Sequence, residues 1–182
     1  MPKPDERKSA RAPLRQDVSD RVADSRGAGE TEFEKPRGVK WVEIKSGLTR
    51  AFVYDLPEPV TDSRLEVLSK VRSAGVSIDF VKFGQGAMSF VAAEADQPAL
   101  EAALKGTSAE VEGGCCVVIV HAVNMQDEEG LVAKIVSEVI ASGEGVDHIG
   151  DMHDRVLLVA SQKTGERLVK KLEKTFGKEG SE

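Results

Sequence analysis

The sequence repeats itself between residues 67–104, VLSKVRSAGVSIDFVKFGQGAMSFVAAEADQPALEAAL, and residues 135–172, IVSEVIASGEGVDHIGDMHDRVLLVASQKTGERLVKKL, which align without a gap at an offset of 68 residues. Ten apolar or glycine positions recur in this register, beginning with Val67 on Ile135. Self-similarity in one fixed register is typical of a structural unit that occurs twice in a chain. We therefore expect a duplicated unit.

The first copy has the pattern of strand, helix, strand, strand, helix, strand. Its strands are β-rich apolar runs, its helices carry apolar residues at helical spacing, and a glycine-rich hairpin turn joins the two middle strands. We expect strands at residues 48–56, 76–83, 87–93 and 109–112, one helix between a cap at Thr61, Asp62 or Ser63 and Gly75, and another between Asp96 and Gly106.

The second copy lacks its last strand. We expect strands at residues 115–123, 146–150 and 155–161 and helices at 131–140 and 165–176. The place of the fourth strand falls on residues 177–180, Gly-Lys-Glu-Gly, which have no apolar face. Residues 39–45, Val-Lys-Trp-Val-Glu-Ile-Lys, are β-rich and belong to neither copy, and Val42 and Ile44 share one face of them. We predict that this segment supplies the missing strand.

Residues 1–38 differ from the rest of the chain in composition. Their sizeable apolar side chains are too few to offset the entropy of ordering such a segment. These five residues are Met1, Leu14, Val18, Val22 and Phe33. We therefore expect a disordered tail.

The duplicated pattern resembles the C-terminal regulatory region of bacterial aspartate kinases, which is built from two ACT domains. Residues 74–79, Ala-Gly-Val-Ser-Ile-Asp, are similar to the stretch after the first ACT helix, and residues 165–176 are similar to the closing helix. The resemblance implies an α+β fold with two ferredoxin-like βαββαβ units side by side, forming an eight-stranded sheet with helices on one side. The implied parts are a strand at 39–46 and ACT units at 47–113 and 114–178.

The resemblance also implies where a small effector would bind, near the loop after the first strand and the start of the second strand of a unit. An amino-acid-binding ACT domain usually has a Pro-Gly turn in that loop. Thr61 and Asp62 hold this place in the first unit, and Glu129 and Gly130 in the second. The implied effector residues are Asn124, Met125, Gln126, Asp127, Gly130, Val146, Asp147 and Ile149 in the second unit, and Asp55, Thr61, Asp62, Ile78 and Asp79 in the first.

Other site types have weaker support. Strand alternation separates the cluster Asp147, His148, Asp151, His153 and Asp154, so we expect no metal site. The adjacent residues Cys115 and Cys116 begin an apolar strand, where cysteine usually serves as a small core residue, so we expect no catalytic thiol. No phosphate-binding glycine loop followed by Lys-Ser/Thr is present, and we expect no cofactor.

Charge and hydropathy bear on the partners. Residues 40–182 carry 16 Lys/Arg against 23 Asp/Glu, a net charge of −7, which disfavours nucleic acid and anionic membrane surfaces. The central strands 87–93 and 155–161 offer one aromatic residue between them, unlike RNA-recognition sheets of the same strand order. The longest apolar run is far shorter than a membrane span, and no secretory signal is evident, so we expect a cytoplasmic protein.

Three hypotheses follow. The first is a non-catalytic regulatory protein that binds a free amino acid or acts through an enzyme partner. The second is a ligand-free dimeric interaction scaffold, and the third is a detached regulatory subunit of an aspartate kinase. All three fit a homodimer, and none of them is an enzyme.

Overall fold

The computed structural model describes residues 38–123, 125 and 129–177, all of which belong to the compact unit Pro36–Glu182. The predicted tail, residues 1–38, lies outside the described residues except for Gly38. The elements in chain order are β1 (Gly38–Val53), α2 (Val60–Ser73), β2 (Ile78–Gly84), β3 (Ala87–Ala93), the 3₁₀ turn η1 (Glu94–Asp96), α3 (Gln97–Ala103), β4 (Ala109–Val123), α4 (Leu131–Ala141), β5 (His148–Asp151), β6 (Arg155–Ser161) and α5 (Gln162–Phe176). None of the described helices is both long and apolar enough to cross a membrane.

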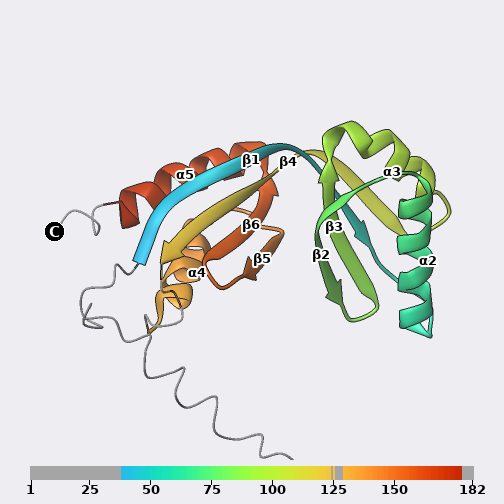
Figure 1. Ribbon diagram of the computed structural model, residues 1–182, viewed down its shortest axis with the longest axis horizontal. Coiled ribbons are helices and arrows are strands. Elements are labelled where there is room, and N and C mark those ends of the chain that lie inside the picture. Colours follow the sequence, from blue (N-terminus) through green and yellow to red (C-terminus); the bar gives the residue numbers. More distant parts are fainter. Residues whose placement is uncertain (1–37, 124, 126–128, 178–182) are drawn as a thin grey trace, which may run out of the picture. The chain divides into compact units, whose positions relative to one another are not determined.

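The strands form one mixed-length antiparallel sheet in the order β2-β3-β1-β4-β6-β5 (Figure 1). The sheet has six strands instead of the eight that the resemblance implies, because β1 and β4 each combine two expected strands. Gly47 and Gly114, with φ of 73° and 65°, lie at the joints and adopt a backbone conformation that glycine tolerates best. The pairing register of β1 with β4 also shifts there, between Lys45 and Leu48.

The segment upstream of the repeat forms the first part of β1 and pairs with β4. Val39 lies opposite Ala122, and Lys45 lies opposite Val117 of β4. The later part of β1 pairs on one side with Ala109–Glu112 of β4 and on the other side with β3. Strands β1 and β4 are therefore paired with each other at both ends of the sheet.

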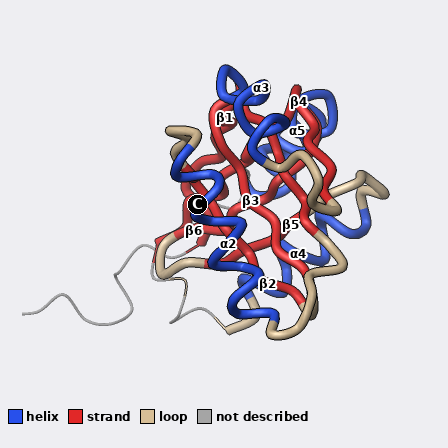
Figure 2. Tube along the Cα trace, turned by 90° about the vertical axis from the view of Figure 1, so that its right-hand side faces the viewer, coloured by secondary structure: helices blue, strands red, loops and turns tan. Residues whose placement is uncertain are grey.

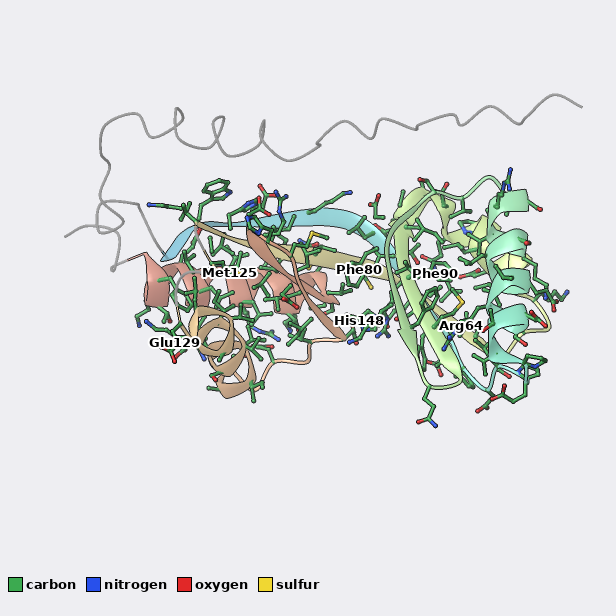
Figure 3. All side chains as sticks on the ribbon, turned by 60° about the horizontal axis from the view of Figure 1, so that its bottom comes forward. Arg64, Phe80, Phe90, Met125, Glu129 and His148 are labelled. Atoms are coloured by element: carbon green, nitrogen blue, oxygen red, sulfur yellow. The ribbon has the colours of Figure 1, made fainter. Side chains whose placement is uncertain are left out.

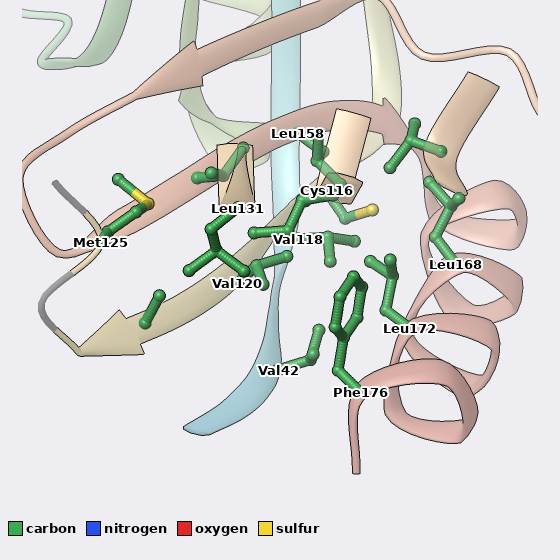
Figure 4. Close-up of a cluster of buried hydrophobic side chains, with 14 residues drawn as sticks. Val42, Cys116, Val118, Val120, Met125, Leu131, Leu158, Leu168, Leu172 and Phe176 are labelled. Carbon is green, nitrogen blue, oxygen red and sulfur yellow. The ribbon is translucent and has the colours of Figure 1, made fainter. Parts of the chain in front are cut away.

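Helices α4 and α5 lie at one end of the sheet and α2 and α3 at the other (Figure 1), and Figure 2 shows the helices in blue and the strands in red, viewed from the end of α2 and α3. We call the buried side chains beneath α2 and α3 the first cluster, with Val53, Val71, Met88, Phe90 and Leu100 among its members. The side chains beneath α4 and α5 form the second cluster (Figure 4), which includes Val42, Cys116, Leu158, Leu172 and Phe176 and against which Ile44 packs. The upstream strand thus contributes Val42 and Ile44 to the core beneath α5.

Helix α2 starts earlier than expected. It begins at Val60 after Pro59, and no side chain caps it. The predicted cap at Thr61, Asp62 or Ser63 is therefore wrong, because these residues already lie within the first turn. The Ser63 hydroxyl instead donates a hydrogen bond to the Pro57 carbonyl at 2.7 Å, which ties the helix to the preceding loop.

The helix-free face carries a third cluster. It consists of Leu48, Val91, Cys115, Val117, Leu157 and Val159, with Phe80 and Ile119 packed against it. The Phe80 ring of β2 lies 6.3 Å from the His148 ring of β5, measured between centroids (Figure 3). The two edge strands of the sheet therefore approach each other across this face, although they are last and first in the strand order.

Candidate functional site

Of the effector residues implied for the second copy, the structure describes Met125, Gly130, Val146, Asp147 and Ile149. Asn124, Gln126 and Asp127 lie outside the described residues. Met125 is buried in the second cluster, and Val146 and Ile149 pack against that cluster. Gly130, with φ of 79°, forms the N-cap of α4.

Asp147 faces a different neighbour from Val146 and Ile149. Its carboxylate forms an ion pair with the Arg50 guanidinium at 2.5 Å, and the same guanidinium contacts Glu112 at 2.7 Å. Asp147 therefore joins β1 and the segment before β5, and its carboxylate is already occupied by a protein cation.

The effector residues implied for the first copy are divided between two places. Thr61 and Asp62 lie in the first turn of α2, and Ile78 and Asp79 begin β2. The Asp79 carboxylate pairs with the Lys45 ammonium at 2.6 Å. Asp55, the remaining member of this group, lines a cavity.

The cavity at Asp55 has a volume of about 210 Å³. Three segments form it: the loop after β1, one face of α2, and the loop between α3 and β4. Its lining residues are Tyr54, Asp55, Leu56, Pro57, Ser63, Glu66, Val67, Lys70, Gly106, Thr107 and Ser108. We call this the Asp55 cavity.

Backbone hydrogen bonds fix the loop that carries Asp55. The Tyr54 amide donates to the Ser108 carbonyl at 2.9 Å, and the Leu56 amide donates to the Gly86 carbonyl at 3.0 Å. Asp55 lies between these two anchors with φ of 51°, a left-handed conformation that aspartate adopts more readily than most residues. The loop therefore has a defined shape before any ligand arrives.

The Asp55 cavity contains both signs of charge. The Lys70 ammonium lies 2.8 Å from the Glu66 carboxylate and 3.4 Å from the Thr107 hydroxyl. The hydrogen bond from Lys70 lowers the pKa of Glu66, so this carboxylate is ionised at neutral pH. Asp55 forms no side-chain hydrogen bond or ion pair within the described part of the chain. A zwitterion could place its ammonium near the carboxylates and its carboxylate near Lys70 and the hydroxyl groups.

Sequence reasoning missed most of this lining. Glu66 and Lys70 were not among the predicted site residues, although their spacing of four predicts an ion pair on one helix face. Thr107 and Ser108 belong to a loop about fifty residues away along the chain, and nothing in the sequence pattern places them beside α2. The polar helix face turned toward the loop after β1 is the signal that could have indicated the cavity.

The clusters considered for other chemistry are dispersed. Among residues 38–123, 125 and 129–177, no three His, Cys, Asp or Glu side chains are grouped to hold a metal ion. Cys115 and Cys116 are buried free thiols. Burial raises the pKa of Cys115, and it raises the pKa of Cys116 to about 11, which keeps both thiols protonated at neutral pH.

Solved structures share this fold. The ligand-free regulatory subunit of aspartate kinase from Thermus thermophilus is 16% identical, with a TM-score of 0.67, and the match covers 76% of this chain and 98% of that subunit. The chain has the fold of an aspartate kinase regulatory subunit. A chain from a structure of aspartokinase alpha and beta subunits is 20% identical, with a TM-score of 0.69 and coverage of 77% and 99%.

A third structure extends the comparison to an intact enzyme. E. coli aspartokinase III in complex with lysine and aspartate is 16% identical with a TM-score of 0.60, and the match covers 79% of this chain and 34% of that enzyme. No family model and no curated protein matches the sequence. The similarity is therefore evident from the three-dimensional arrangement of the chain. Because these structures are only 16–20% identical in sequence, the comparison shows a shared fold.

Proposed function

We propose that this chain is a non-catalytic regulatory protein of the ACT type that binds a free amino acid. The proposal includes two ferredoxin-like units at residues 47–113 and 114–178, the second completed by residues 39–46. One observation carries the regulatory role: the match covers 98% of the regulatory subunit of aspartate kinase from Thermus thermophilus, so nearly all of that subunit has a structural counterpart in this chain.

The Asp55 cavity is the proposed amino-acid site. It holds two carboxylates and one ammonium group within a volume of about 210 Å³, and this polarity suits a small zwitterion. Lysine is the first candidate because E. coli aspartokinase III is described in complex with lysine and aspartate. The second carboxylate, from Asp55 or Glu66, would meet the extra ammonium group of lysine. We keep the residues implied for the second copy as a further proposed site, centred on Gly130 and Asp147.

Thermal unfolding with each of the twenty amino acids tests the proposal, because a ligand that binds the native state raises the midpoint. We expect one or a few amino acids to raise it, and we expect Glu66→Gln and Lys70→Met to reduce that rise. Lys170→Met, an exposed substitution on α5, serves as the matched control and should respond like the wild type. A screen in which no amino acid raises the midpoint would refute amino-acid binding.

The alternative of a ligand-free dimeric scaffold has its own supporting observation. Strand β2 is an edge strand, and Val81 and Phe83 on it are 44% and 53% exposed. An open strand edge with exposed apolar side chains is suited to pairing with another strand. We propose a second copy of this chain as the partner. Sedimentation should show a dimer that Phe83→Lys dissociates, and a monomeric wild type would refute it.

Regulation requires a partner whose state the protein changes. We propose the aspartate kinase of the same organism, because two of the similar structures are a regulatory subunit of aspartate kinase and a chain of aspartokinase alpha and beta subunits. Co-purification of the two chains, with inhibition or activation of the kinase reaction, would support this. A kinase that neither binds nor responds would leave the amino-acid proposal standing and refute this partner.

A further inference from the structure

A second cavity lies on the helix-free face, where His148 of β5 faces the strands β1, β2 and β3 (Figure 3). Its volume is about 160 Å³. Its lining residues are Phe52, Lys82, Gly84, Ala87, Met88, Ser89 and His148. None of these residues lines the Asp55 cavity, so the two cavities are separate.

The strand register sets three of the lining side chains in one row. Ser89 of β3 lies opposite Phe52 of β1 on one side and opposite Lys82 of β2 on the other. Residues that lie directly opposite each other share a face of the sheet, and this face is the helix-free one because Val91, two residues along β3, belongs to the third cluster. Neighbouring strands are about 4.8 Å apart, so the row spans about 10 Å.

Two hydrogen-bond donors in this row have no partner. The Lys82 ammonium forms no ion pair or hydrogen bond within the described part of the chain, and the Ser89 hydroxyl forms no hydrogen bond there either. The Lys82 side chain is exposed to solvent, whereas Ser89 as a residue is 3% exposed. The third polar group, His148 Nε2, is fully buried and has no hydrogen-bond partner among the described residues.

The neighbouring charges leave the cavity with an excess positive charge. In the next row, the Arg50 guanidinium is balanced by Asp147 and Glu112. No acidic residue lines the cavity itself, and the rest of its wall is apolar, with the Phe52 ring as its largest side chain. Such a wall favours a ligand with one anionic group and an apolar body.

We propose that this cavity binds a small monocarboxylate with an apolar body. The carboxylate accepts hydrogen bonds from the Lys82 ammonium and the Ser89 hydroxyl, with His148 beside it, and the apolar body packs on Phe52. An apolar cavity of about 150 Å³ holds benzene, so about 160 Å³ accommodates a phenyl ring or a branched aliphatic group. This site goes beyond the proposed amino-acid site and needs no ammonium group on the ligand.

Calorimetric titration with phenylacetate tests the proposal, with phenylacetamide as the uncharged analogue of the same shape. We expect phenylacetate to bind the full chain at least about tenfold more tightly than phenylacetamide, because a charge-assisted contact with Lys82 is lost in the amide. Lys82→Met should weaken phenylacetate binding by at least about tenfold, and Ser89→Ala should weaken it less.

Lys170→Met is the control for the loss of one surface lysine, and we expect it to bind phenylacetate like the wild type. Equal affinities for the acid and the amide would overturn the proposal, as would an unchanged affinity in Lys82→Met. So would the absence of phenylacetate binding up to about 10 mM, the weak end of specific small-ligand affinity. The comparison of acid with amide uses the wild-type chain, so it decides the question even if a variant fails to fold.

Discussion

Substitution of Gly165 by alanine probes how closely α5 approaches the sheet. Gly165 is buried in the first turns of α5, above the upstream part of β1 and the later part of β4. A methyl group added at this position would lie 2.2 Å from Cys116 Sγ, 3.0 Å from Ile44 Cδ1 and 3.3 Å from Val118 Cγ2. The first distance is far below van der Waals contact, so either the helix or Cys116 must move.

Two opposing effects set the magnitude. Alanine in place of glycine stabilises an exposed helix position by about 1 kcal/mol. Overpacking a close-packed core costs about 1–3 kcal/mol, and the Cys116 side chain has little freedom to move because it is fully buried. The balance of the two effects is a loss of about 0–2 kcal/mol, and because Cys116 is fully buried we expect Gly165→Ala to lower the free energy of unfolding by an amount in the upper half of that range. The sign of this change is informative, because the higher helix propensity of alanine alone would raise the free energy of unfolding.

Urea unfolding monitored by the fluorescence of the single tryptophan, Trp41, measures this change. Gly145→Ala is the matched control, since a methyl group there would meet nothing within 4 Å, and it should change stability by at most about 0.5 kcal/mol. In the double variant Gly165→Ala/Cys116→Ala, removal of the sulfur should recover at least about 1 kcal/mol relative to additivity. A Gly165→Ala protein that is more stable than the wild type would refute the close packing of α5 on Ile44 and Cys116.

Three further changes test other parts of the structure. Phe176→Ala should cost about 3–5 kcal/mol in urea unfolding, because Phe176 is 2% exposed in the second cluster, and a loss below about 1 kcal/mol would contradict its burial. Arg50→Met should cost about 1–2 kcal/mol, with the loss smaller in 1 M salt, since it leaves Asp147 and Glu112 without their cation; a loss independent of salt would argue against these ion pairs. Cys116 should resist iodoacetamide at pH 8 in the native state and react once unfolded. Its folded pKa of about 11 exceeds the ordinary value of 9.0, so stability should fall as the pH rises from about 9 to about 11, and a rise in stability there would contradict the assignment.

The fold could be predicted largely from hydrophobic periodicity and the internal repeat. Val42 and Ile44 share one face of a β-rich segment, and this was enough to predict a strand upstream of the repeat. The continuity of β1 and of β4 was not predictable, because glycine-containing stretches such as Gly113-Gly114 read equally well as linkers. The φ angles of the glycines at these joints distinguish a linker from a bend within one strand, and those angles depend on tertiary context.

The candidate site was less accessible to sequence reasoning. Asp55 was identified through the family resemblance, yet Glu66, Lys70 and Thr107 reach the same cavity from elements that the repeat pattern describes only by their apolar faces. Polar residues that line a cavity follow no periodicity, since their positions depend on how loops from distant parts of the chain meet. The row of Phe52, Ser89 and Lys82 likewise follows from strand register, which the turn sequences leave undetermined.

We propose that the Asp55 cavity binds a free amino acid in a protein with the aspartate kinase regulatory fold. Site-resolved NMR of the backbone amides during titration with the amino acid that most raises the unfolding midpoint tests it most directly. We predict the largest shifts at Asp55, Ser63, Lys70 and Thr107, together with loss of those shifts in Glu66→Gln. Shifts confined to residues outside this cavity, or no shifts with any amino acid, would contradict the claim.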